Sequence, residues 1–168
     1  AFGLLFLLPR GIWPPMITIV FANGLIIVGS FFFLRGMAQY QGSKATPVVL
    51  EVLITTALVI AFYYFSHISE SLSVRVIIIS AFSSLVMLRG FIILWPTIKE
   101  SKGVGIVVGI GLLFHAIFFL SRIFMTLYLD NGKPMLEGGG GSVWIMAEAS
   151  VFIFLCTISF SLLTNLVL

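Results

Sequence analysis

Hydrophobic residues form five long runs along this chain, separated by short polar or glycine- and proline-rich breaks. The runs cover residues 12–34, 46–65, 73–95, 104–129 and 143–167. Each reaches about 20 residues or more, the length that a helix needs to cross a hydrocarbon core of about 30 Å. The short alternating segments of a transmembrane β-barrel are absent. The pattern therefore predicts transmembrane helices, which satisfy their own backbone hydrogen bonds in lipid.

A shorter apolar stretch, residues 1–8, comes before Pro9-Arg10-Gly11. It is too short to cross a bilayer, so we interpret it as the tail of an earlier helix. The final run still has a helical pattern at Leu168, and we expect the chain to be a fragment of a longer one. The expected fold is an all-α polytopic bundle with five full spans and this tail, forming one transmembrane domain over residues 1–168.

Composition supports a membrane environment and excludes several other classes. The chain is 60% hydrophobic and 9% charged, whereas soluble domains carry about 25% charged residues. A net charge of +3, scattered along the sequence, gives no patch for nucleic acid. Cys156 is the single cysteine, so neither an internal disulfide nor a thiolate metal cluster can form.

Loop charges predict the orientation of the bundle. The basic residues Arg35 and Lys44 lie in the predicted 35–46 loop, and Lys99 and Lys102 lie with Glu100 in the predicted 96–102 loop. The loops expected at the other side are less basic overall; their charged residues are Arg10, Glu70, Arg75, Asp130, Lys133 and Glu137. The more basic side should be cytoplasmic. Alternation of the spans then places the C-terminus in the cytoplasm, and we expect the bacterial inner membrane.

Ionisable residues within the spans are the first candidates for function, because each costs about 2.5–3.5 kcal/mol at the centre of a membrane helix. Glu51 and Arg89 are predicted at similar depths near the cytoplasmic side, and we expect a structural intramembrane pair. Arg122 and Glu148 match in depth near the outer side. They can lock two helices together, or they can line an outward-facing ligand cavity.

His115 lies near the predicted midplane, seven residues before Arg122 on the same helix face, and Asn23 is expected at a similar depth. A buried histidine can be a hydrogen-bonded structural residue or part of a ligand site. Arg75 is expected near the mouth of the outer cavity. The candidate sensing residues are therefore His115, Arg122, Glu148, Arg75 and Asn23.

Motifs of soluble enzymes are missing from the sequence. It contains no phosphate-binding loop with lysine, no His-Glu-x-x-His, no Cys-x-x-Cys and no nucleophile elbow. His67 is expected in an outer loop and His115 at mid-depth, so the two should not ligate one haem iron. We expect no catalytic residue, no metal site and no cofactor in this chain.

Three stretches carry a resemblance to a known family: 21–29 leading to Leu34-Arg35-Gly36, Ser73-Val74-Arg75-Val76 leading to Ser80, and 115–122. With the order of helices and sparse polar residues, they resemble the N-terminal multi-helix membrane region of bacterial signalling proteins, especially GGDEF-domain diguanylate cyclases. The resemblance implies a sensory and anchoring domain whose last helix relays a stimulus to a cytoplasmic output domain. It also implies a homodimer through that helix and an unknown small ligand.

Two other functions fit the same sequence. A structural subunit of a larger respiratory or transport complex would use the ion pairs only to join helices. A small carrier would need a hydrated path past Glu51, His115 and Glu148. The charges fall into two depth clusters with only His115 and Asn23 between them, which disfavours a continuous path.

Overall fold

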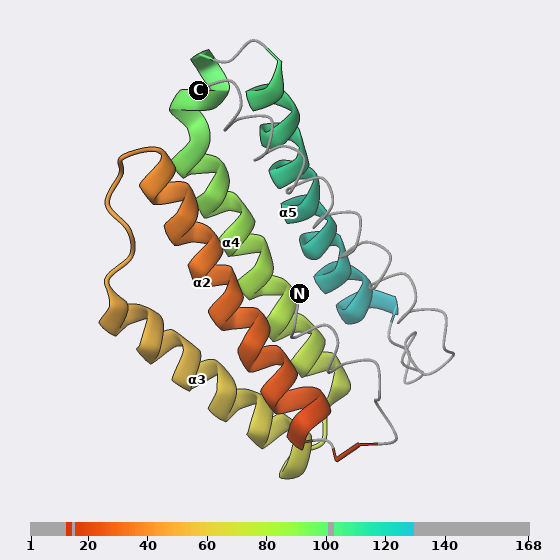
Figure 1. Cartoon of the computed structure of the whole chain (residues 1–168). Helices are drawn as coiled ribbons and strands as arrows, with labels where there is room; N and C mark the ends of the chain where they lie inside the picture. Colours follow the sequence, from red (N-terminus) through yellow and green to blue (C-terminus); the bar gives the residue numbers. More distant parts are fainter. Residues whose placement is uncertain (1–12, 15, 101–102, 130–168) are drawn as a thin grey trace.

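The computed structural model describes residues 13–14, 16–100 and 103–129, and its regular elements there are helices (Figure 1). A π-helix, η1 (Met16–Phe21), continues directly into α2 (Ala22–Tyr40). The chain then forms α3 (Val48–His67), α4 (Leu72–Glu100) and α5 (Val104–Leu129). Neighbouring helices run in alternating directions, as Figure 1 shows.

Four of these stretches are long and apolar enough to cross a membrane: Met16–Tyr40, Val48–His67, Leu72–Glu100 and Gly105–Tyr128. The prediction of an all-helical protein of membrane-spanning character is confirmed for the described part of the chain, and it indicates a membrane location. The predicted fifth span, 143–167, and the stub 1–8 lie outside the described residues.

Two helix ends differ from the predicted limits. α2 continues past residue 34 to Tyr40, so Arg35 lies inside the helix and not in the following loop. α4 continues through Pro96 to Glu100, although a proline has no N–H to donate to the preceding turn. A hydrogen bond of 2.6 Å from Thr97 Oγ1 to Gln41 Oε1 holds this last part of α4 against the end of α2. The connection from α2 to α3 and the connection from α4 to α5 therefore lie at the same end of the bundle, as alternation of the spans requires.

The end of α2 is fixed by a glycine. Gly42 has φ +64°, a left-handed conformation that glycine adopts without a steric penalty. The N–H of Gly42 donates to the Gln39 carbonyl, and the N–H of Ser43 donates to the Ala38 carbonyl. These two bonds form a Schellman motif, which ends the helix sharply. The chain then returns toward α2 and enters α3.

The helices pack around two apolar clusters. The larger one joins α2, α4 and α5, and its buried members are Leu34, Met37, Val86, Met87, Leu94, Val108, Leu112 and Ala116. The smaller one joins η1, α2 and α3 through Val20, Ile27, Phe31 and Phe62. α5 packs most extensively on α4. Gly90 permits close approach at the centre of the larger cluster, because a Cβ there would lie 2.9 Å from Met37 Sδ.

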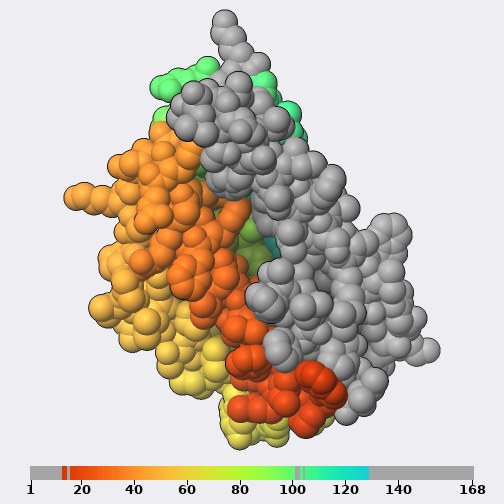
Figure 2. All heavy atoms as spheres, viewed as in Figure 1, coloured from red at the N-terminus to blue at the C-terminus, as the bar shows by residue number. Residues whose placement is uncertain are grey.

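α3 is the least buried of the membrane-length helices. Its outer side exposes large apolar side chains, of which Val49 is 71% and Ile60 62% exposed. The side chains of α2 and α3 form a continuous surface in the space-filling view of Figure 2. In a membrane such a surface can be covered by lipid tails.

Candidate functional site

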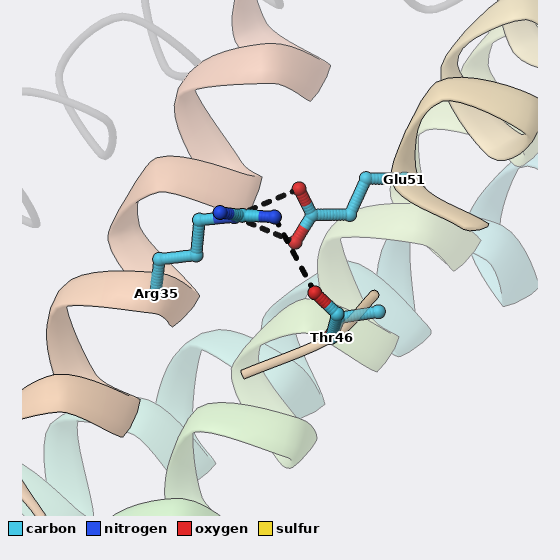
Figure 3. A network of polar contacts seen from close by, with 3 residues as sticks. All are labelled: Arg35, Thr46 and Glu51. Carbon is cyan, nitrogen blue, oxygen red and sulfur yellow. Dashed lines mark hydrogen bonds and ion pairs between the residues drawn. The ribbon is translucent and has the colours of Figure 1, made fainter. Parts of the chain in front are cut away.

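An ion pair joins α2 to the first turn of α3 (Figure 3). The Nε of Arg35 donates to both carboxylate oxygens of Glu51, at 3.0 Å and 2.9 Å. One terminal nitrogen of the same guanidinium donates to the Thr46 carbonyl at 3.4 Å. The Glu51 side chain is 11% exposed and that of Arg35 is 32% exposed. The pair therefore neutralises a largely buried carboxylate, and the Thr46 contact ties the loop to the same group.

This geometry corrects the predicted partner of Glu51. The sequence suggested Arg89, on the assumption that Arg35 belonged to a loop. Because α2 extends to Tyr40, Arg35 lies one to two turns inside the helix and reaches Glu51. Arg89 lies on an exposed side of α4, and it has no ion pair among the described residues. Among the described residues, Glu51 is thus paired with Arg35 and not with the predicted Arg89.

Polar groups interrupt the apolar contact between α4 and α5. Ser84 of α4 is buried, and its Oγ donates to the Ala116 carbonyl of α5 at 3.1 Å. His115, the residue before Ala116, is 3% exposed, and its Nδ1 lies 2.8 Å from the Gly111 carbonyl. A carbonyl only accepts, so Nδ1 carries the hydrogen in this contact. When the ring is neutral, Nε2 is then an acceptor.

Ser80 lies one turn before Ser84 on the same face of α4. It is fully buried, and its Oγ has no hydrogen-bond partner among the residues that the structure describes. A buried polar group without a partner costs about 1–3 kcal/mol. Ser80 therefore marks a place where this packing of α4 leaves a polar group unsatisfied.

Arg122 is partly buried on α5, and its carbonyl accepts a hydrogen bond of 2.8 Å from Thr126 Oγ1. It follows His115 by seven residues, so the two side chains share a helix face about 10 Å apart along the axis. Glu148, the predicted partner of Arg122, lies outside the described residues. Of the residues predicted to line the outer cavity, His115 and Arg122 therefore lie on the same helix.

Arg75 lies at the connection between α3 and α4. Its Nε donates to the Ser71 carbonyl at 3.2 Å, and a terminal nitrogen donates to Ser66 Oγ at 3.3 Å. Ser66 is in the last turn of α3 and Arg75 is in the first turn of α4. These contacts make Arg75 a link between two helices, in addition to any role at a cavity mouth.

Asn23 supports the junction between η1 and α2. Its Nδ2 donates to the Ile19 carbonyl at 2.7 Å, one turn earlier in the chain. It follows the start of this span at Met16 by seven residues, about 10 Å along the axis, so it lies nearer one end than the predicted centre. π-Helical turns within longer helices are frequent at functional sites, but this hydrogen bond of Asn23 is internal to its own helical segment.

Three polar residues were missed by the sequence-based selection: Arg35, Ser80 and Ser84. The first was assigned to a loop. The two serines stand four residues apart in an otherwise apolar run, which places them on one helix face, and this spacing could have indicated a polar helix contact. Among the residues that the structure describes, no three His, Cys, Asp or Glu side chains gather as metal ligands.

No protein-family model, no curated protein and no solved structure matches this chain. The functional interpretation therefore depends on the residues of this bundle and their geometry.

Proposed function

We propose that this chain is the membrane-embedded sensory and anchoring domain of a bacterial signal-transduction protein. In this proposal it lies in the inner membrane with five spans and a cytoplasmic C-terminus. The segment 143–167 relays a stimulus to a cytoplasmic output domain, for which the resemblance favours a diguanylate cyclase. The chain itself carries no catalysis, and homodimerisation through the last helix brings two output domains together.

The observation that supports this proposal is the buried polar contact between α4 and α5. Ser84 donates a hydrogen bond across the interface, while the buried Ser80 hydroxyl has no partner within the described helices. A second packing that gives Ser80 a partner would recover about 1–3 kcal/mol. Two packings separated by so little can be shifted by a ligand that binds them with unequal affinity.

The stimulus is proposed to act at the outer part of the same interface. His115 and Arg122 share one face of α5, and an acidic ligand group would suit the Arg122 guanidinium. Glu148 is the proposed third member of this site. Arg75 and Asn23 are assigned supporting positions, since their hydrogen bonds stabilise a helix end and a helix junction.

The test uses the full-length protein that carries this domain, with its cytoplasmic output measured against stimulus. Ser80→Ala removes the unsatisfied hydroxyl and should stabilise the described packing, which shifts the ratio of the two packings by about 5- to 150-fold. Ser30→Ala is the matched control, because the Ser30 hydroxyl bonds within its own helix to the Ile26 carbonyl. The proposed mechanism fails if both variants give the same output at every stimulus level.

Arg122→Ala separates sensing from relay in the same assay. We expect the basal output to persist and the response to stimulus to be lost. An unchanged response would remove Arg122 from the sensing site.

A structural subunit of a larger membrane complex is the alternative, and the observation that favours it is the exposed apolar side of α3. Helices of other subunits could cover this side as well as lipid does. Purification in mild detergent distinguishes the two: stoichiometric partners that remain bound after the output domain is removed would favour the subunit.

A further inference from the structure

One face of α4 points away from the bundle and combines two cations with an apolar groove. This exposed α4 face is formed by Arg89, Ile92, Trp95 and Lys99. The spacing of these residues places them on one side of the helix. The opposite side is buried in the larger apolar cluster, where Val86, Met87 and Leu94 face α2 and α5. The exposed α4 face is therefore the side that meets the surroundings of the bundle.

The apolar part of this face is an open groove of about 270 Å³, lined by Phe91, Ile92 and Trp95. Ile92 is 61% exposed and Trp95 is 44% exposed. The Phe91 and Trp95 rings lie 5.3 Å apart at an angle of 50° and form one wall. A groove of this kind, open along a membrane-length helix, fits a hydrocarbon chain.

The two cations flank the groove at different depths. Lys99 Nζ lies over the Trp95 ring, 5.0 Å from its centroid, so the ammonium is held at the level of the tryptophan. Arg89 is six residues before Trp95, about 9 Å deeper along the axis. Its long side chain can extend toward the membrane surface. Both charges can therefore approach a single headgroup placed near Trp95, a residue type enriched at the membrane interface.

The charges of the exposed α4 face determine which kind of ligand it can bind. Arg35 is neutralised by Glu51, whereas Arg89 has no ion pair among the described residues. Glu100 is exposed directly after Lys99 and about 16 Å along the axis from Arg89, so these three residues together keep a net positive charge. The face thus offers two cations beside a hydrocarbon groove. We infer that the exposed α4 face binds an anionic phospholipid, with its headgroup at Arg89 and Lys99 and an acyl chain along Phe91, Ile92 and Trp95.

The experiment measures quenching of Trp95 by brominated lipids. The whole chain, with Trp13→Phe and Trp144→Phe so that Trp95 reports alone, is placed in phosphatidylcholine vesicles. Increasing shares of brominated phosphatidylglycerol or brominated phosphatidylcholine are then added. Each cation near the surface contributes about a fivefold preference for anionic lipid. The same quenching should therefore need a share of brominated phosphatidylglycerol at least about fivefold smaller than the share of brominated phosphatidylcholine.

Arg89→Gln and Lys99→Gln should each reduce this preference by about fivefold. Lys44→Gln is the matched control, because Lys44 is exposed in the loop at the same end of the bundle but outside the groove. It should leave the preference unchanged. Equal quenching by the two lipids would overturn the inference, and so would an equal loss in Lys44→Gln. If the face instead binds a protein helix, the chain would form an oligomer that Arg89→Gln dissociates, and quenching would show no lipid preference. That result would also overturn the inference.

Discussion

Arg35 and Arg89 both lie in membrane-length helices, yet removing their charges should have very different effects on stability. Glu51 is a buried residue, and both of its carboxylate oxygens accept from Arg35 Nε. Arg35→Gln leaves that carboxylate buried without a countercharge. Arg89→Gln removes an exposed charge that has no ion pair among the described residues.

The magnitude follows from the geometry of the pair. Two unit charges about 4 Å apart attract by about 4 kcal/mol at an effective dielectric constant of about 20. The Arg35 side chain is 32% exposed, so solvent and headgroups screen part of this attraction. We expect Arg35→Gln to lower the free energy of unfolding by about 2 kcal/mol. Arg89→Gln should change it by less than about 0.5 kcal/mol.

The assay is reversible unfolding in an uncharged maltoside detergent, which removes any contribution from anionic lipid. A double-mutant cycle adds Glu51→Gln and the Arg35→Gln/Glu51→Gln variant. The double variant should be more stable than the sum of the single losses predicts, because it leaves no unpaired buried charge. The reasoning would be refuted if Arg89→Gln cost as much as Arg35→Gln, or if the two pair substitutions were additive.

Three further substitutions, one of them with a matched control, test the packing by the same unfolding measurement. Ser84→Ala should cost about 0.6 kcal/mol, the average for a hydrogen bond between membrane helices, and a gain would contradict the bond to Ala116. Gly90→Leu should cost about 1–3 kcal/mol because the site has no room, whereas Gly36→Leu, at a position with nothing within 4 Å, should be tolerated. Gly42→Ala should cost about 1 kcal/mol because of its left-handed φ, and an unchanged stability would mean that another turn can end α2.

Hydrophobic run length predicted the four described helices well, because the cost of unsatisfied backbone groups in lipid leaves few alternatives to helix. Charges and prolines at the ends of the runs were less informative. Arg35 was assigned to a loop since a charge in a span is costly, but a carboxylate 16 residues later removes that cost. Pro96 was taken as a helix end, but the contact between Thr97 and Gln41 keeps the turn in place.

The depth of a residue in the membrane does not determine which residue of a neighbouring helix it contacts. Glu51 and Arg89 were matched by their distance from the membrane surface, yet helix rotation turns Arg89 outward. The sequence alone does not show which serine of the pair Ser80 and Ser84 bonds to a neighbouring helix. Only the position of α5 shows that Ser84 meets a carbonyl of the neighbouring helix and that Ser80 does not.

The connection between α4 and α5 has a consequence for assembly in the cell. Only residues 101–103 separate the two helices, so they can enter the bilayer together as a hairpin. Leu34 and Met37 of α2 belong to the same apolar cluster as residues from both members of that hairpin. A growing chain that had reached only Glu100 would leave these side chains partly uncovered. Synthesis of α5 is therefore the step at which α2 and α4 acquire the third helix of this cluster.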